Sequence, residues 1–215
     1  MYKNKLSVST SARSAVLKAL LNSLGAKSHE TEDHAVRMHH AAAAMGFALE
    51  MSPSEMNRLS LLVSLHDIGK IGIPESILKK PGSLDEEEWG IVKRHPEIGY
   101  RIASATDEFS AVAREILHHQ EWWDGSGYPA GLKGEAIPLL SRIVTIIDAF
   151  DAMTNERPYS PAKSLEEAVE ELESHSGRQF DPQLLEVFLE LIRRGDIPVT
   201  DTNPDNPHRG RNTVN

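Results

Sequence analysis

The sequence contains no cysteine among its 215 residues. This absence excludes disulfide scaffolds, thiolate zinc sites and cysteine nucleophiles. Its apolar runs are too short to span a bilayer, and the N-terminus lacks the apolar core of a signal peptide. Basic residues are in the minority, with 23 Lys and Arg against 32 Asp and Glu, and the formal net charge is -9. We therefore expect a cytoplasmic protein that binds neither duplex nucleic acid nor a membrane surface.

Histidine is the residue type that stands out once these classes are excluded. The chain has 10 histidines in an otherwise ordinary composition, with 40% hydrophobic and 26% charged residues. Such a composition is typical of a globular protein. Because cysteine is absent, a metal site in this chain must use imidazole nitrogens and carboxylate oxygens as ligands.

The hydrophobic pattern predicts an all-α fold of several packed helices. Apolar residues recur at intervals of three and four, and there is no strand pattern or internal repeat. Ser52, Pro53 and Glu55 form a helix start signal, a capping box with proline in the first turn. A further helix starts near Ser83 and is interrupted near Pro96. The other predicted helices cover about residues 12–26, 31–49, 56–67, 107–120, 138–154, 164–174 and 182–194.

Two segments depart from this helical pattern. The Gly-rich stretch of residues 124–134 lies between two predicted helices and is long enough to be a functional loop. From about Asp196 the chain is rich in Pro, Asn, Asp, Thr and Arg and offers almost nothing to bury. Residues 196–215 are therefore predicted to form a disordered tail.

His66 and Asp67, at the end of an apolar helix, are the first residues that could carry chemistry. Adjacent helix residues point about 100° apart, so the two side chains can hold one ion only at a crowded helix end. A carboxylate there can also bridge to a second ion. By itself, such a pair is more often a capped helix end with solvated side chains.

Other histidines and carboxylates strengthen the case for a metal site. Glu30 and His34 lie four residues apart on one helix face, and His95 stands at a bend beside a proline. Asp148 and Asp151 occur on an otherwise apolar helix, where a carboxylate is costly to bury unless it is paired or metal-bound. Each of these features has a simpler explanation when taken alone: Glu30 and His34 could form a surface pair, His95 could cap a helix, and Asp151 could lie on a solvated face. The occurrence of all of them in one chain argues against coincidence.

The order of the motifs along the chain resembles that of a known family. The series is His66-Asp67-x-Gly69-Lys70, His95-Pro96, His119-x-Glu121, Asp124-Gly125-Ser126-Gly127-Tyr128-Pro129, Asp148 and Arg157-Pro158-Tyr159. It resembles the HD-GYP domain, the branch of the HD phosphohydrolases that hydrolyses bacterial cyclic di-GMP. The resemblance covers about residues 30–191. It implies an HD-domain-like helical bundle with a Gly-rich GYP loop, which we expect to occupy residues 12–195.

The resemblance also implies a centre of two divalent metal ions, with a third in some members, and it favours iron or manganese. Two such ions can activate a water molecule and stabilise an in-line displacement at phosphorus. The implied ligands are His34, His66, Asp67 and Asp148 for the first ion, with Asp67 bridging, His95 and His119 for the second, and Glu30 for a third.

Further site residues are implied by the same resemblance. The implied catalytic set is Lys70, Asp67 and Asp151, with Lys70 near the scissile phosphate and Asp151 beside the substrate and the metals. Tyr128 and Arg157, together with Lys70, are implied to contact the dinucleotide. The implied reaction is hydrolysis of cyclic di-GMP to the linear dinucleotide pGpG, with GMP as a further end-point.

Two departures from the family pattern keep alternatives open. Gln120 stands where the family has a second histidine, unless a shift by one residue makes His118 and His119 the pair. Ser160 replaces a basic residue. The chain could therefore be a catalytically weakened module that binds cyclic di-GMP, or a hydrolase acting on another nucleotide. A di-iron oxygenase is disfavoured by the GYP loop and Arg157.

Residues 1–11 carry a second, shorter resemblance. Met1-Tyr2-Lys3-Asn4-Lys5-Leu6 resembles the closing helix of a GGDEF domain. This implies that residues 1–11 are a linker and the remnant of an upstream GGDEF or sensory domain in a longer parent chain. The helix expected from Ala12 could then pair with its twin in a homodimer.

Overall fold

A computed structural model of the chain describes residues 32–156 and 161–197. Within these residues the fold is all-α, as predicted, and the one β-type contact is an isolated bridge between Ser176 and Phe180. Several expectations fall outside the described residues: those for Glu30, Arg157 and Ser160, for the linker of residues 1–11, for the helix over residues 12–26, and for residues 198–215 of the tail.

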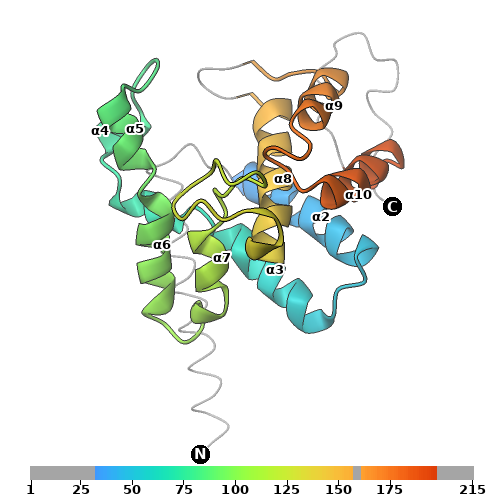
Figure 1. Cartoon of the computed structure of the whole chain (residues 1–215), viewed down its shortest axis with the longest axis horizontal. Coiled ribbons are helices and arrows are strands. Elements are labelled where there is room, and N and C mark those ends of the chain that lie inside the picture. The colour runs from blue at the N-terminus through green and yellow to red at the C-terminus, as the bar shows by residue number, and fades with distance from the viewer. Residues whose placement is uncertain (1–31, 157–160, 198–215) are drawn as a thin grey trace, which may run out of the picture.

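Nine α-helices follow one another along the described residues (Figure 1). Their bounds are α2 Glu32–Ala48, α3 Pro53–Leu65, α4 Glu75–Leu78, α5 Glu86–Val92, α6 His95–Ser104, α7 Ala113–Leu117, α8 Leu139–Thr154, α9 Leu165–Ser174 and α10 Pro182–Arg193. Short 3-10 helices occur at Ile68–Gly72, Ser110–Val112 and Gly134–Ala136.

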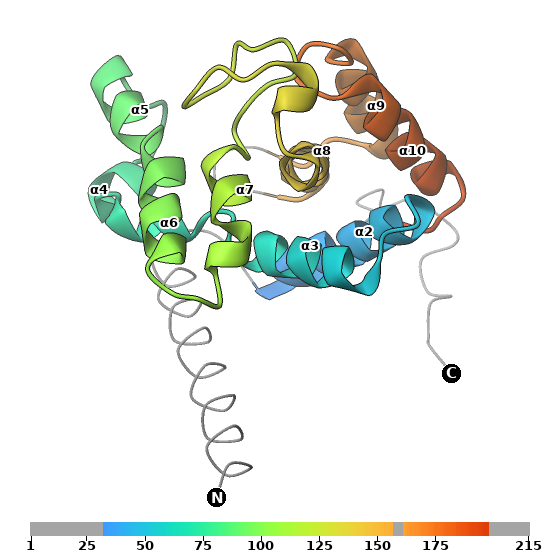
Figure 2. The same cartoon turned by 60° about the horizontal axis from the view of Figure 1, so that its bottom comes forward.

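Helix α8 is the centre of the bundle. Figure 2 views it nearly end-on, with α2, α3, α7, α9 and α10 around it, and α8 packs against all five. Its apolar side chains Ile143, Ile146 and Phe150 are buried in the core, as expected of a helix that is apolar on most of its surface. Its two aspartates therefore stand beside the core, where an ionised group needs a partner.

Side-chain caps set where several helices begin. The capping box predicted at Ser52 and Glu55 is confirmed at the start of α3. Equivalent boxes start α5 at Asp85 and α9 at Ser164. Helix α5 ends at Val92 and α6 begins at His95, which confirms the predicted interruption near Pro96. A proline in the first turn of α6 is tolerated because the backbone N–H it lacks has no partner there.

The helix predicted over residues 107–120 is wrong in its extent. Only α7 and the short 3-10 helix before it are helical in this stretch. The Thr106 hydroxyl accepts a hydrogen bond from the Phe109 amide at 3.3 Å, and the Ser110 hydroxyl donates to the Asp107 carbonyl at 2.9 Å. Such local bonds compete with helix formation and hold the segment in a turn.

The start of the predicted tail is also corrected. Ile197 is 4% exposed and belongs to the hydrophobic core. It lies in the segment predicted to be a disordered tail, because the residues around it are polar. Burial of the isoleucine contributes roughly 1.5–3 kcal/mol, and the Asp196 amide donates to the Leu191 carbonyl at 3.0 Å, so both hold the start of this segment against the core.

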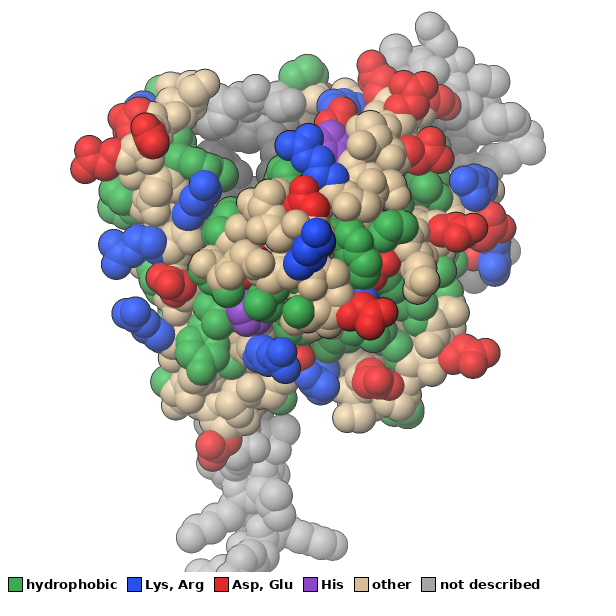
Figure 3. Space-filling view, viewed as in Figure 1, with side chains coloured by type: hydrophobic (Ala, Val, Ile, Leu, Met, Phe, Trp, Pro, Cys, Tyr) green, Lys and Arg blue, Asp and Glu red, His purple; other side chains and the backbone are tan. Residues whose placement is uncertain are grey.

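Exposed acidic side chains cluster on more than one helix, including α5 and α9. Helix α9 exposes a row of glutamates (Glu166, Glu167, Glu170, Glu171 and Glu173), and Figure 3 shows acidic side chains over α9 and α10. Among the described helices, none combines the length and the apolar character that a bilayer span requires.

Candidate metal centre

Separate helices bring the predicted ligands into one region. His34 lies on α2, His66 and Asp67 follow α3, His95 begins α6, His119 follows α7, and Asp148 lies on α8. They form two groups, His34 with His66 and Asp148, and Asp67 with His95 and His119. Within each group, one ligand atom of every residue lies within 4.8 Å of the others.

The imidazole rings join the two groups into one centre. The His66 and His119 ring centroids are 5.5 Å apart across the boundary between the groups. Within the groups, the His34–His66 distance is 6.2 Å and the His95–His119 distance is 5.1 Å. The structure thus places together every predicted ligand that lies in its described part.

A close backbone approach brings the end of α3 to α6. A Cβ atom added to Gly69 would lie 1.8 Å from the carbonyl oxygen of His95 and 2.6 Å from the amide nitrogen of Gly99. Only glycine leaves room for this approach. The contact therefore sets how near the His66–Asp67 pair comes to His95.

Three of the histidines share an arrangement that fixes their protonation. In each ring, Nδ1 lies within hydrogen-bond distance of the backbone carbonyl oxygen three residues earlier, at 2.9 Å in His66, 2.9 Å in His95 and 2.7 Å in His119. A carbonyl oxygen can only accept, so Nδ1 must carry the hydrogen. In a neutral ring Nε2 then presents a lone pair. Metal-binding histidines hold their second nitrogen in this way.

The second group brings three acceptor atoms together. Nε2 of His95 lies 3.1 Å from Nε2 of His119 and 3.1 Å from Oδ1 of Asp67. Burial lowers the pKa of His119 and so favours its neutral ring. Oδ1 of Asp67 is buried and accepts no hydrogen bond from any described residue. Lone pairs facing one another in a buried site repel unless a cation lies between them. The donor set of imidazole nitrogen and carboxylate oxygen fits a divalent transition metal.

Asp67 stands between the two groups. Its Oδ1 faces His95 and His119, while its Oδ2 lies 3.3 Å from Nε2 of His66 and 2.5 Å from Nζ of Lys70. Burial alone would raise the pKa of Asp67, but its interactions with Lys70 and with the imidazoles of His66 and His119 outweigh burial and hold that pKa well below its usual value. The carboxylate is therefore ionised, and its two oxygens are divided between the two groups.

Asp151 lies behind His34 and outside both groups. Its Oδ2 accepts from Nδ1 of His34 at 2.6 Å, and its Oδ1 accepts from Nε of Arg37 at 2.5 Å. Although burial opposes ionisation, the hydrogen bonds from His34 and Arg37 lower the pKa of Asp151. Both oxygens are engaged with protein donors, so the geometry favours a role in holding His34 over the catalytic role expected from the sequence.

The sequence leaves open whether Gln120 or His118 accompanies His119 at the centre. His119 belongs to the second group, whereas Nδ1 of His118 faces Oε1 of Glu121 at 3.4 Å. The alternative in which a one-residue shift pairs the two histidines is therefore not supported. The backbone carbonyl of Gln120 accepts the Tyr128 amide at 3.1 Å, so Gln120 helps to hold the Gly-rich loop.

Glu121 anchors the Gly-rich loop beside the centre. It is 1% exposed, and its two oxygens accept the Ala130 amide at 2.7 Å and the Leu132 amide at 3.1 Å. The loop places the Tyr128 ring 6.4 Å from that of His95. Burial raises the pKa of Tyr128, so its hydroxyl stays protonated at neutral pH and can donate a hydrogen bond.

Replacing Glu121 with glutamine should loosen this loop. The new amide group presents a donor to one of the two backbone N–H groups, so a part-buried N–H loses its acceptor, at a cost of about 1 kcal/mol. We expect faster hydrogen exchange at Ala130 and Leu132, measured by NMR or mass spectrometry. Glu135→Gln, at an exposed position of the same segment, is the matched control. Unchanged exchange in Glu121→Gln would contradict the anchoring role.

Arg37 is a residue near the centre that was not predicted from the sequence. It lies three residues after His34 on α2, so the two share a helix face. That spacing was a usable signal. Its partner Asp151 is more than 100 residues away, with a sequence separation of 114, and spacing gave no indication of the pairing.

Comparisons with known proteins find a matching family model and similar phosphodiesterases. A model of the HD-domain family matches residues 16–184. A cyclic di-GMP phosphodiesterase from Thermotoga maritima is 42% identical over 184 residues, which are 84% of this chain and 50% of that protein. A cyclic di-GMP phosphodiesterase response regulator from Xanthomonas campestris is 45% identical over 155 residues, which are 71% of this chain and 41% of that protein.

A solved structure is similar in fold as well. The crystal structure of a cyclic GMP-AMP-specific phosphodiesterase from Vibrio cholerae aligns with a TM-score of 0.63 and 26% identity. The alignment covers 83% of this chain and 48% of that one. The chain thus spans about half or less of the length of each of these three proteins.

Proposed function

Because this chain belongs to the HD-domain family, we propose that it is a metal-dependent phosphodiesterase that hydrolyses cyclic di-GMP. The observation that carries the proposal is the meeting of Nε2 of His95, Nε2 of His119 and Oδ1 of Asp67, all acceptors, at distances as short as 3.1 Å. The substrate class is supported by the two relatives from Thermotoga maritima and Xanthomonas campestris, which are cyclic di-GMP phosphodiesterases.

The two ligand groups would hold two divalent ions, with Asp67 shared between them. Iron or manganese suits the mixed imidazole and carboxylate donors. When bound, such ions supply Lewis-acid stabilisation of the phosphoryl oxygens and a hydroxide nucleophile at neutral pH. His66, His95 and His119 are held ready for this role by their carbonyl partners.

Lys70 and Tyr128 would act on the substrate side. Nζ of Lys70 contacts Oδ2 of Asp67, and the side chain is 25% exposed, so its charge can also reach a phosphate beside the centre. A positive charge placed there stabilises the negative charge that develops on the phosphoryl oxygens. Nζ of Lys93 lies 5.5 Å from the Tyr128 ring and adds local positive charge to a chain with a net charge of -9.

The proposal predicts turnover that depends on the added metal. Protein purified without oxygen and stripped of metal should convert cyclic di-GMP to pGpG when Mn²⁺ or Fe²⁺ is restored, and should be inactive in chelator. Product chromatography measures the conversion. Tight binding of cyclic di-GMP without product would instead support the weakened binding module. Preferential hydrolysis of cyclic GMP-AMP would support the alternative of a different cyclic dinucleotide.

A further inference from the structure

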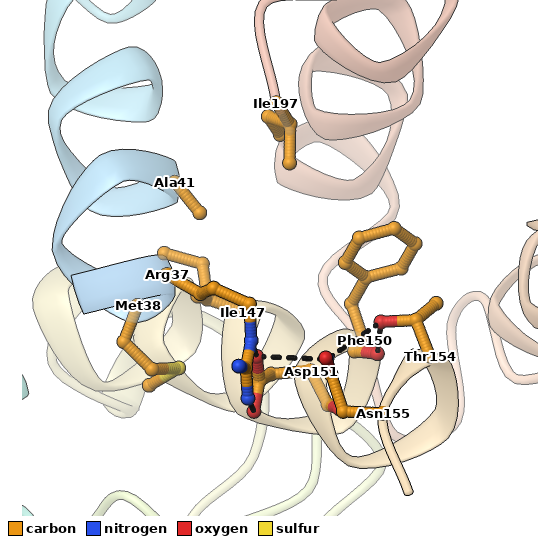
Figure 4. Close-up of a pocket in the computed structure, with 9 residues that line it drawn as sticks. All are labelled: Arg37, Met38, Ala41, Ile147, Phe150, Asp151, Thr154, Asn155 and Ile197. Atoms are coloured by element: carbon orange, nitrogen blue, oxygen red, sulfur yellow. Dashed lines mark hydrogen bonds and ion pairs between the residues drawn. The ribbon is translucent and has the colours of Figure 1, made fainter. Parts of the chain in front are cut away.

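Arg37 and Asp151 form a two-pronged ion pair that the proposed reaction does not use. Nε of Arg37 lies 2.5 Å from Oδ1 of Asp151, and Nη2 lies 3.1 Å from Oδ2. Figure 4 shows the guanidinium and the carboxylate side by side between α2 and α8. Such a planar pairing fixes the plane of a carboxylate as well as its charge.

The same carboxylate holds a predicted metal ligand. Oδ2 of Asp151 lies 2.6 Å from Nδ1 of His34. An ionised carboxylate can only accept, so Nδ1 of His34 carries the hydrogen and Nε2 is the ligand nitrogen. Nδ2 of Asn155 also donates to Oδ1 of Asp151 at 3.1 Å. The orientation of His34 therefore depends on Asp151, and that of Asp151 depends on Arg37 and Asn155.

His34 differs in this respect from the other three histidines of the centre. His66, His95 and His119 each donate to a carbonyl oxygen of the backbone, which secondary structure already holds in place. A carboxylate at the end of a side chain can rotate between rotamers. His34 alone among these four thus needs a second side chain to fix its partner.

The ion pair borders a cavity whose other lining residues are partly apolar. Met38, Phe150 and the buried Ile197 line this cavity together with Arg37 and Asp151, as Figure 4 shows. A charge pair interacts more strongly when water is excluded. Loss of Arg37 would take from the buried Asp151 its permanently charged partner and two of its hydrogen bonds, so Asp151 would rearrange.

We propose that Arg37 is a positioning residue for the ion of the group His34, His66 and Asp148. It fixes Asp151, Asp151 fixes the ring of His34, and the affinity of this group for its ion depends on a residue that does not touch the ion. Outer partners of metal-binding histidines change metal affinity by about 10–100-fold. The inference rests on the proposed metal centre and adds to it a residue outside the ligand set.

The test is a titration of the metal-free protein with Mn²⁺ in the absence of substrate. Binding is measured by calorimetry and by the EPR signal of unbound Mn²⁺. We expect two binding events in the wild type. In Arg37→Gln, the Mn²⁺ affinity of one event should fall by about 10–100-fold, and the affinity of the other should stay within about twofold of its wild-type value. Arg37→Lys keeps the positive charge but cannot form the two parallel hydrogen bonds of a guanidinium. Its affinity in the weakened event should lie between those of the wild type and Arg37→Gln.

Arg142→Gln is the matched control. It breaks another part-buried Arg–Asp pair, in which Nη1 of Arg142 lies 2.6 Å from Oδ2 of Asp181, and should leave both events unchanged. Equal weakening of both events in Arg37→Gln, or of neither, would overturn the inference while the proposed function stands. If Arg37→Gln does not fold, Arg37→Lys carries the test. A wild-type protein that binds no Mn²⁺ overturns both proposals.

Discussion

Asp67→Ala is expected to abolish turnover and metal retention together. The two oxygens of Asp67 are divided between the two ligand groups, at 3.3 Å from Nε2 of His66 and 3.1 Å from Nε2 of His95. Their removal takes a ligand from both groups at once. We expect turnover to fall by a factor on the order of 10³–10⁴, the scale seen when an essential catalytic group is lost.

The stability of the metal-free protein separates this effect from unfolding. In the metal-free wild type, interactions with Lys70 and the neighbouring imidazoles hold the pKa of Asp67 well below its usual value, so the ionised carboxylate contributes to stability at neutral pH. Asp67→Ala removes this contribution and the ion pair with Lys70. We therefore expect the metal-free variant to fold but to unfold at a somewhat lower temperature than the metal-free wild type, whereas added Mn²⁺ should raise the unfolding temperature of the wild type only.

Metal analysis, calorimetric unfolding and product chromatography on the same preparations make the comparison. Asp107→Ala, which changes an exposed carboxylate, should retain metal and activity. If Asp67→Ala kept a full complement of metal and wild-type turnover, the shared-ligand role would be refuted. Loss of activity with both ions retained would restrict Asp67 to a role in the chemical step.

The candidate ligands could be predicted from the sequence because the order of the motifs along the chain resembles that of a known family. A His–Asp pair at a helix end is by itself more often a capped helix end than a metal site, so residue types alone did not identify the set. His34, His66, Asp67, His95, His119 and Asp148 are all found in the two groups. The helices that carry them were predictable as well, since apolar spacing and the capping boxes at Ser52 and Ser164 are local signals.

What could not be predicted depends on contacts between distant residues. The sequence places Asp151 on α8 but does not show that its carboxylate turns away from the centre to Arg37 and His34. Ile197 is one apolar residue in a polar segment, and its burial depends on a gap in the core that only the assembled helices create. The short α7 reflects side-chain bonds of Thr106 and Ser110 that compete with a helix.

The assembly of the centre depends most directly on Gly69. The added Cβ of an alanine would meet the His95 carbonyl oxygen at 1.8 Å and the Gly99 amide nitrogen at 2.6 Å. Both are backbone atoms, so no side-chain rotation relieves the clash. The 3-10 helix Ile68–Gly72 and helix α6 must move apart, and this separates the His66–Asp67 pair from His95. Overpacking of this kind costs about 3 kcal/mol or more when the neighbours cannot yield.

Gly69→Ala should therefore lower the unfolding temperature of the metal-free protein by about 6–12 °C, at 2–4 °C for each kcal/mol in a chain of this size. It should also weaken Mn²⁺ binding, because the second ligand group loses its geometry. Gly90→Ala is the matched control: Gly90 lies within α5, and a Cβ there meets nothing within 4 Å. Alanine in a helix is favoured over glycine by about 0.5–1 kcal/mol, so this variant should be slightly more stable than the wild type. A Gly69→Ala protein as stable as Gly90→Ala, with wild-type Mn²⁺ affinity, would show that the close backbone approach does not set the geometry of the centre.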